Sequence, residues 1–324
     1  MDKLIVSTSP HQRDNVTTRR IMLDVIIALL PAAIAGCIFF GWRALLIIAV
    51  CVGTSVASEF LFNLIVKKKQ TVGDLSAIVT GLLLALNLST NVTIWQCVVG
   101  SVFAIVVVKC LFGGIGHNFA NPAISARVLL LVAFSTSVAG GAATNFVEVA
   151  SGATPLSMIR ENMAAGSPAV SGLPSLFNMF IGNIGGAIGE TCVPALLLGF
   201  AYLLARKVIR WHTPVIFVGT VFVFSLIYGF ATGEGFTFAI YEILGGGLIL
   251  GAVFMATDYS TTPINLGGKM VFALGCGIIT CLIRFFGDYP EGVSFAILLM
   301  NILAPLIEKA TAKRPFGGKK NVKK

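Results

Sequence analysis

Residues 20–40 read RIMLDVIIALLPAAIAGCIFF, and only Arg20 and Asp24 in this stretch carry a charge. A run of about 20 mainly apolar residues is long enough to cross the hydrocarbon core of a bilayer as a helix. The polar residues before it lack the brief apolar core and the small-residue cleavage site of a signal peptide. We therefore expect this stretch to be retained as a membrane-spanning helix.

The rest of the 324-residue chain has the same character. Hydrophobic residues make up 56% of the chain and charged residues only 11%, and the mean hydropathy is +0.91. In an average soluble domain about a quarter of the residues are charged. This composition excludes a soluble enzyme and a disordered chain, and it predicts that most of the chain lies in hydrocarbon.

Apolar segments of helix length follow one another along the sequence. They fall near 20–40, 42–66, 74–89, 93–112, 122–138, 188–208, 212–231, 237–257, 267–286 and 291–309. We therefore predict an all-α integral membrane protein with about ten transmembrane helices.

The 23 basic residues gather at the ends of these segments. If both termini are cytoplasmic, only Arg43, Arg160 and Arg284 fall on the other side of the membrane. Basic residues accumulate in cytoplasmic loops, so this bias predicts a multi-pass protein with both termini in the cytoplasm. We interpret the basic tail as a topology anchor that meets anionic lipid, so the net charge of +9 requires no nucleic-acid partner.

The two halves of the chain show a faint repeat. An apolar helix ending in a cation and Phe-Gly, a polar turn and a second apolar helix occur at 102–131 and again at 278–303. Internal repeats, often inverted, are common in transporters. The expected parts are a cytoplasmic segment at 1–19, a five-helix half at 20–138, an extracytoplasmic loop at 139–187, a second five-helix half at 188–309 and a cytoplasmic tail at 310–324.

Three segments are expected to break the helices, at 113–122, 182–190 and 257–263. Their glycines and prolines disfavour a straight helix. Non-helical backbone near lipid is tolerated only where it is packed in protein or lines a cavity. Close helix packing joined by ordinary loops is the alternative explanation, and it remains open at this point.

Six carboxylates lie in or beside the apolar segments: Asp24, Glu59, Asp74, Glu190, Glu242 and Asp258. Capping or solvation at the membrane interface explains those near helix ends. Glu59 and Glu190 have apolar or small residues on both sides, so they are the better candidates for an ion pathway.

The cysteines and histidines do not suggest a metal site. The seven cysteines lie almost wholly in apolar segments without Cys-x-x-Cys spacing, and the three histidines are far apart in sequence. We interpret the cysteines as small buried hydrophobic residues. Any redox centre of this chain would then be organic or would belong to a partner.

The connection from about Val138 to Asn178 is unusually long for a loop without structure. Within it Thr154 precedes Pro155, a pattern typical of an N-cap followed by the first residue of a helix. A residue before proline favours an extended backbone. We expect a short helix that starts at Pro155 and runs through Arg160.

Residues 151–154, Ser-Gly-Ala-Thr, resemble the motif at which a flavin transferase joins FMN to a threonine hydroxyl through a phosphodiester. Further similarity extends over nearly the whole chain. Its motifs are Ser9-Pro10-His11 with Arg20-Ile21-Met22, residues 81–87, residues 113–122, Gly189-Glu190-Thr191, and residues 284–301 with Tyr289-Pro290-Glu291-Gly292. The chain resembles the family that contains the D subunit of the Rnf electron-transport complex and the B subunit of the sodium-pumping NADH:quinone reductase. Its short N-terminal segment is more similar to the Rnf member.

The resemblance implies that FMN is attached covalently to Thr154. Ser151, Gly152 and Ala153 would form the recognition sequence, and Pro155 would restrain the backbone.

The family motif usually has aspartate six residues before the threonine, where this chain has Glu148. The carboxylate is kept, so modification is still expected. The resemblance also implies a second, non-covalent riboflavin, as in the quinone-reductase relative, with Asn118 and Asn121 as its polar contacts.

The function implied by the resemblance is that of a membrane component of an ion-translocating ferredoxin:NAD⁺ oxidoreductase. Its FMN would carry electrons, and electron transfer would be coupled to export of Na⁺ or H⁺ across a bacterial or archaeal cell membrane. The implied partners are the other Rnf subunits and, during maturation, the flavin transferase. No residue looks like a catalytic base or nucleophile. The alternatives are an ion or solute transporter of ten helices without its own redox cofactor, and a structural scaffold for other redox subunits.

Overall fold

The computed structural model describes residues 16–138, 153–287 and 289–312, and this part of the chain is helical without a β-strand. Among the described residues, five helices are long and apolar enough to cross a membrane. They are α1 (Thr18–Phe40), α2 (Trp42–Ile65), α10 (His212–Thr232), α13 (Leu266–Phe286) and α14 (Val293–Thr311). The predicted all-α membrane fold is thereby confirmed.

The other predicted spans contain shorter or bent helices. The helix α11 (Gly235–Leu244) and the pair α12 (Leu248–Leu250) with η3 (Gly251–Met255) are together long and apolar enough for a span, and they meet at a bend of 60°. The shorter apolar helices are α3 (Ser76–Leu86), α4 (Ile94–Val102) continued by η2 (Phe103–Cys110), α5 (Pro122–Ala133) and α9 (Val193–Ala205). Every apolar segment identified in the sequence thus contains a helix.

Some of these helices are shorter than the hydropathy pattern suggests. The start of α3 is delayed to Ser76, because residues 72–74 form the 3₁₀ turn η1 (Val72–Asp74) and the Asp74 carboxylate accepts a hydrogen bond from the Ser76 N–H at 2.8 Å. The start of α9 is delayed to Val193, because residues 182–192 are not helical. The apolar composition therefore locates the membrane segment in the sequence, and the local turns determine at which residue its helix begins.

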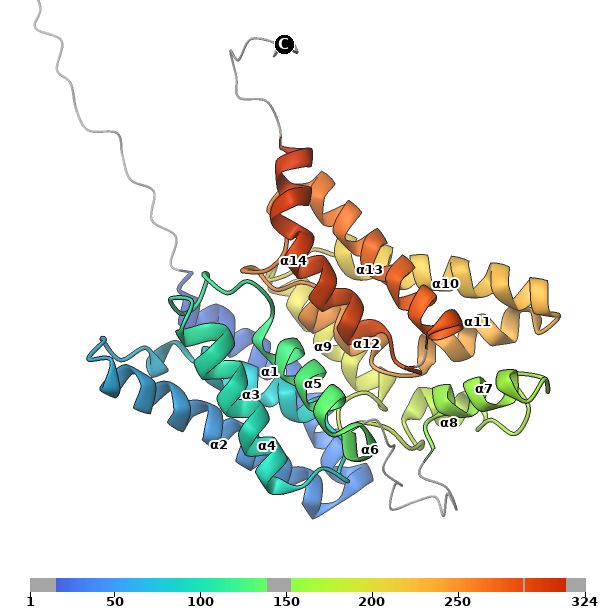
Figure 1. Ribbon diagram of the computed structural model, residues 1–324, viewed down its shortest axis with the longest axis horizontal. Helices are drawn as coiled ribbons and strands as arrows, with labels where there is room; N and C mark the ends of the chain where they lie inside the picture. Colours follow the sequence, from blue (N-terminus) through green and yellow to red (C-terminus); the bar gives the residue numbers. More distant parts are fainter. Residues whose placement is uncertain (1–15, 139–152, 288, 313–324) are drawn as a thin grey trace, which may run out of the picture.

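Each half of the chain packs around one long helix. In the first half α2 lies along α3 and α4, and in the second half α10 lies along α11 and α13. Contacts of α1 with α9 and of α5 with α14 join the halves, which occupy the left and right of Figure 1. Both repeated sequence units form a helix, a loop and a second helix, and their second helices are α5 and α14.

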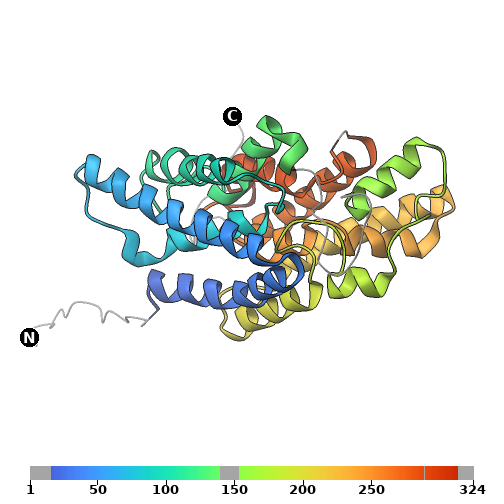
Figure 2. The same ribbon diagram turned by 90° about the horizontal axis from the view of Figure 1, so that it is seen from below.

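The described ends of the chain lie on the same side of the molecule. Thr18 at the start of α1 and Glu308 near the end of α14 line one cavity, together with Ile115 and Asp258 from two of the non-helical segments. We call this the terminal side. Pro122, the first residue of α5, also lies here, and α5 leads away from it toward the connection that carries Thr154 (Figures 1 and 2).

The three segments expected to break the helices are non-helical except for Pro122, and they either pack against protein or line a cavity. In the segment 182–190, the N–H groups of Ile188 and Gly189 donate to the carbonyls of Leu88 and Leu86 at 3.0 and 2.8 Å. A Cβ on Gly189 would lie 2.5 Å from the Leu86 side chain. The other two segments line the cavities on the terminal side. These segments therefore meet the requirement for irregular backbone within a membrane protein.

The contact between α1 and α9 depends on a glycine. A Cβ added at Gly199 would lie 2.2 Å from the Ala28 carbonyl oxygen, whereas a Cβ at Gly219 of α10 would meet nothing within 4 Å. Gly199→Ala should destabilise the protein by about 1–3 kcal/mol because the backbones must separate. Gly219→Ala should change stability by less than about 1 kcal/mol, in the stabilising direction. Thermal unfolding of the two purified variants in detergent measures the difference, and equal melting temperatures would contradict the close approach.

Candidate functional site

Thr154 caps the helix that follows it, as the sequence pattern predicts. Its backbone is extended, with φ −77° and ψ 154°, and its Oγ1 accepts a hydrogen bond from the Ser157 N–H at 3.2 Å. Pro155 is the first residue of α7 (Pro155–Ala164), which includes Arg160. Ala153 is half-buried beside it. The predicted recognition residues Glu148, Ser151 and Gly152 lie outside the described part of the chain.

The described part of the long connection, from Ala153 onward, packs onto the membrane helices. It contains α7 and α8 (Leu176–Ile181), and Leu156 and Ile159 of α7 share an apolar cluster with Phe238 and Tyr241 of α11. The Tyr241 hydroxyl donates to the Pro174 carbonyl at 2.9 Å. Apolar burial and this hydrogen bond together hold the start of α7 in a defined position against α11.

A small cavity lies beside Thr154. It is lined by the start of α7, the 182–190 segment and the bend between α11 and α12, and the lining residues are Thr154, Pro155, Ile184, Gly185, Gly186, Glu190, Thr191, Gly246 and Glu291. Gly246 has a φ of +65°, and a Cβ there would lie 2.7 Å from Leu156. A Cβ on Gly247 would lie 2.4 Å from Glu190 Oε1. Glycines at the bend therefore let α7 and Glu190 approach the backbone.

Arg127 of α5 forms the centre of a buried polar network next to this cavity. One terminal nitrogen, Nη1, lies 2.6 Å from Glu190 Oε1 and donates to Asn87 Oδ1 at 2.6 Å. The other, Nη2, donates to Glu291 Oε2. The Arg127 and Glu190 side chains are 5% and 3% exposed, so this ion pair is almost completely removed from solvent.

Residues from three of the sequence motifs meet at Arg127. Asn87 ends the motif at 81–87, Glu190 belongs to Gly189-Glu190-Thr191, and Glu291 belongs to the Tyr289-Pro290-Glu291-Gly292 motif. Sequence reasoning identifies the motifs but not Arg127 as their common partner. A basic residue in the middle of an apolar segment is the signal that could have revealed this, because such a charge requires a counter-charge.

The other candidate for an ion pathway, Glu59 of α2, is also in an ion pair. Its Oε2 lies 2.9 Å from Lys109 Nζ, and its Oε1 accepts a hydrogen bond from the Thr71 hydroxyl at 2.6 Å. Lys109 also donates to the Ser76 hydroxyl at 2.5 Å. Glu242 pairs with Arg284 at 2.9 Å in the second half.

These pairs correct the interpretation of two basic residues in the topology argument. The distribution of charge places Lys109 and Arg127 in cytoplasmic loops, but they are only 2% and 4% exposed and are paired with carboxylates within the helical body. They therefore neutralise buried charge. The bias of the remaining basic residues has the same sign without them.

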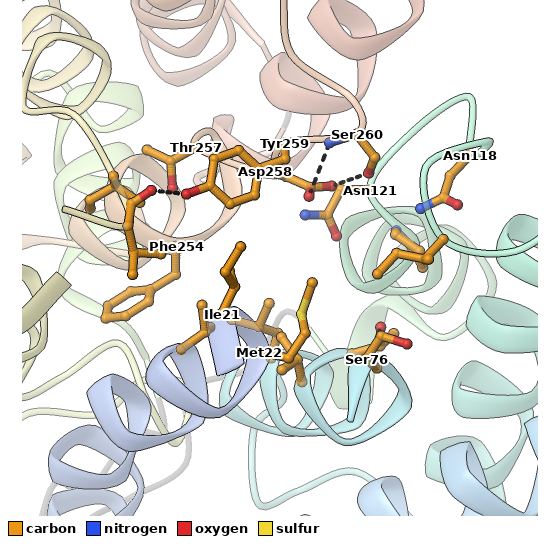
Figure 3. Close-up of a pocket in the computed structure, with 18 of the residues that line it drawn as sticks. Ile21, Met22, Ser76, Asn118, Asn121, Phe254, Thr257, Asp258, Tyr259 and Ser260 are labelled. Carbon is orange, nitrogen blue, oxygen red and sulfur yellow. Dashed lines mark hydrogen bonds between the residues drawn. The ribbon is translucent and has the colours of Figure 1, made fainter. Parts of the chain in front are cut away.

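A larger hollow opens between the segments 113–122 and 257–263 on the terminal side (Figure 3). Two adjoining cavities of about 90 and 420 Å³ share Ile21, Met22, Ile115 and residues 258–260 as lining. The structure brings both predicted asparagines to the first of them. Combined, they have the size typical of a site for an organic ligand.

The two asparagines have different surroundings. Asn121 caps α5, because its Oδ1 accepts hydrogen bonds from the N–H groups of Ala123 and Ile124 at 3.0 and 3.4 Å. Asn118 Oδ1 is buried without a hydrogen-bond partner among the described residues. An unpartnered buried acceptor is costly, so this amide is suited to a ligand that donates a hydrogen bond.

Asp258 provides the acidic group of the same hollow. Its carboxylate accepts hydrogen bonds from the Ser260 and Thr261 hydroxyls at 3.0 and 3.1 Å. Burial raises the pKa of the Asp258 carboxyl above its ordinary value, although these hydrogen bonds act in the opposite direction. The hollow therefore combines apolar walls with a few polar groups, as ligand sites commonly do.

Among the described residues no group of three or more His, Cys, Asp or Glu side chains could hold a metal ion, and the seven cysteines are free and either buried or half-buried. The cavity beside Thr154 and the hollow on the terminal side are two places where the described part of the chain could hold a ligand.

The chain matches known proteins over almost its entire length. The model of the NQR2, RnfD, RnfE family matches residues 5–317. A protein of Acetobacterium woodii named as the D subunit of a Na⁺-translocating ferredoxin:NAD⁺ oxidoreductase complex is 45% identical, with 97% of this chain and 95% of that protein covered.

Two further relatives carry similar names. The D subunit of the proton-translocating ferredoxin:NAD⁺ oxidoreductase complex of Clostridium ljungdahlii is 37% identical, and the match covers 96% of each chain. The D subunit of the ion-translocating oxidoreductase complex of Stutzerimonas stutzeri is 36% identical, and the match covers 92% of each chain.

Removal of the Arg127 charge should strongly destabilise the fold. Arg127→Gln leaves Glu190 and Glu291 without their counter-charge, at an expected cost of about 3–5 kcal/mol in unfolding free energy. The double variant Arg127→Gln/Glu190→Gln should recover part of that loss, because the more deeply buried carboxylate is then neutral. Thermal unfolding of the three proteins in detergent tests this. A double variant less stable than Arg127→Gln alone would show that the pair is not the source of the stability.

Proposed function

The chain belongs to the NQR2, RnfD, RnfE family, and we propose that it serves as the D subunit of an Rnf ion-translocating ferredoxin:NAD⁺ oxidoreductase complex. The observation that carries the proposal is the similarity to proteins of that name over 92–97% of this chain. The described helices agree with a multi-pass membrane protein. The partners would be the other Rnf subunits in a bacterial or archaeal cell membrane.

We propose further that FMN is bound covalently to Thr154 through a phosphodiester. Thr154 stands at the N-terminus of α7 with an extended backbone. The helix dipole and the N–H groups of the first turn favour an anion at such a position, so the phosphate of the flavin would be stabilised there, where the Ser157 N–H already donates to Thr154 Oγ1. The flavin supplies the electron-transfer chemistry, and the chain would supply its placement.

The burial of Thr154 bears on when the flavin transferase acts. The Thr154 residue is 6% exposed, and α7 is packed on α11 through Leu156 and Ile159. A modifying enzyme could not reach a hydroxyl in that state. The flavin would therefore be attached while the connection is undocked, and α7 would settle on α11 afterwards.

In the topology that we propose, the cavity beside Thr154 and the hollow on the terminal side would lie on opposite sides of the membrane. With the terminal side in the cytoplasm, the connection that carries Thr154 faces outward, as the distribution of basic residues favours. A covalent bond suits an outer site, because a cofactor lost there would not readily be replaced. The C-terminal basic residues would meet anionic lipid on the cytoplasmic side.

The hollow on the terminal side is our candidate for a second, non-covalent riboflavin. Its support is the unpartnered Asn118 Oδ1, which could accept a hydrogen bond from a ring N–H, beside the apolar side chains of Ile21 and Phe254. Figure 3 shows these groups around one space, with Asn121 next to Asp258.

For the coupling ion, we retain Glu59 and Glu190 as candidate pathway residues. Both are buried carboxylates with a basic partner from another helix, Lys109 and Arg127 respectively. The relatives are named as Na⁺-translocating or proton-translocating, and the proposed function includes export of one of these ions.

The covalent flavin is tested by fluorescence on a denaturing gel. Wild-type protein from cells that contain the flavin transferase should give a fluorescent band, and Thr154→Ala should abolish it. Ser157→Ala removes a different hydroxyl from the same helical turn and should leave the band unchanged. A dark wild-type band, or a fluorescent Thr154→Ala band, would refute attachment at Thr154 and favour a transporter without its own cofactor.

The second flavin is tested by the flavin released on denaturation of the purified complex. Asn118→Ala should lower the released flavin at least tenfold relative to wild type, which is the effect of about 1.4 kcal/mol of lost binding. The covalent band should persist. Asn265→Ala, before α13 and outside the lining of the hollow, is the matched control. Unchanged release from Asn118→Ala would argue against a flavin at this place.

A further inference from the structure

The small cavity beside Thr154 contains polar atoms without partners. The Thr191 residue is 2% exposed and its Oγ1 has no hydrogen-bond partner in the part of the chain that is described. Glu190 Oε2 is equally buried and also lacks one. Both residues line the cavity with Thr154. Buried oxygens without partners are costly, so two of them at one cavity indicate an occupant.

The charges around the cavity do not balance. One guanidinium, that of Arg127, faces two carboxylates, Glu190 and Glu291. Arg284, which also lies near Gly246, is already paired with Glu242. The Glu291 side chain is 19% exposed and can be solvated, whereas that of Glu190 is 3% exposed, so Glu190 is the carboxylate that a further positive charge would stabilise.

We propose that this cavity binds one monovalent cation, Na⁺ or H⁺, between Glu190 and Thr191. The cation would contact Glu190 Oε2 and Thr191 Oγ1, the two unpartnered oxygens, and would complete the neutralisation of the carboxylate pair. With H⁺ as the occupant, the proton would sit on Glu190 Oε2, and the Thr191 hydroxyl would be a second polar group in the same cavity. Both forms supply the same missing charge.

The size of the cavity fits a single small occupant. Its volume is about 10 Å³, which is close to the space needed for one water-sized particle. The glycines at 185, 186 and 246 form part of the wall, and a Cβ on Gly186 would lie 3.0 Å from the Thr191 side chain. A volume of this size suits a single small cation.

The position of the site couples it to Thr154. A phosphodiester on Thr154, which rests on the proposed function, would add a negative charge at the lining of the same cavity. Opposite charges at such short range attract strongly in a poorly solvated site. Cation binding should therefore be tighter in the flavin-bearing protein, and by linkage a cation should favour negative charge on the flavin.

The Na⁺ form is tested by thermal unfolding of the purified complex with NaCl titrated against choline chloride at constant ionic strength. Wild type should be stabilised with a saturable Na⁺ midpoint. Thr191→Val keeps the shape of the side chain and removes a hydroxyl that has no hydrogen-bond partner among the described residues. In the absence of Na⁺ its unfolding temperature should therefore equal that of wild type. With a bound cation, the midpoint should rise at least about tenfold in this variant and in Glu190→Gln.

The H⁺ form is tested by infrared spectroscopy of the same proteins. If the occupant is H⁺, the unfolding temperature of wild type should not depend on Na⁺. Its infrared spectrum should show the carbonyl stretch of a buried protonated carboxyl group. This band should vanish in Glu190→Gln and shift in Thr191→Val, which removes a polar group from the same cavity. Glu234→Gln changes a carboxylate at the start of α11 that binds the Ala169 N–H outside the cavity, so it should resemble wild type in both measurements.

The proposal is overturned if wild type shows neither a saturable Na⁺ effect nor the protonated-carboxyl band, or if the observed effect is unchanged in Thr191→Val. Because Thr191→Val requires no new contact, it decides the matter even if Glu190→Gln does not fold. Thr154→Ala separates this proposal from the flavin. If the Na⁺ midpoint of Thr154→Ala equals that of wild type, the cation site is supported and the flavin phosphodiester is contradicted.

Discussion

The rest of the structure depends on one constraint, which is that a charged side chain buried away from water needs a counter-charge beside it. The ion pair between Arg127 and Glu190 is the main example. This pair joins α5 of the first half to the irregular segment before α9 of the second. Asp24 and Arg206 form another pair across the halves, between α1 and the end of α9. Two further ion pairs each join helices within one half, Glu59 with Lys109 in the first half and Glu242 with Arg284 in the second. Buried charges thus select which helices lie together, whereas lipid-facing apolar side chains cannot discriminate between neighbours.

Hydropathy is sufficient to locate the helices of this protein, but partners and bends require three-dimensional packing. The long helices α1 and α2 follow directly from apolar runs, and the cap at Thr154 follows from a local pattern of Thr and Pro. The 60° bend between α11 and α12 is not specified by composition alone. Its glycines admit many conformations, and the packing of Leu156 and Glu190 against them selects this one.

The candidate sites likewise combine residues that the sequence indicates with surroundings that only the three-dimensional packing determines. Sequence motifs identify Thr154, Asn118 and Glu190 as residues of interest, because each stands in a locally unusual context. Their surroundings come from positions up to 164 residues apart, such as Arg127 and Glu291. No local pattern encodes such a contact. The cavities are visible only in the structure, because each of them is lined by several segments that are distant in the sequence.

The cavity between Thr18 and Glu308 has a consequence for biosynthesis. Its lining includes Thr18 of α1 and Glu308 of α14, the first and the last described helices that the ribosome makes, besides the segments around Ile115 and Asp258. An unfinished chain therefore lacks the Glu308 side of this cavity until α14 has been made. The adjoining smaller cavity contains no residue of α14, so the inner part of the hollow can form earlier in synthesis than its outer part.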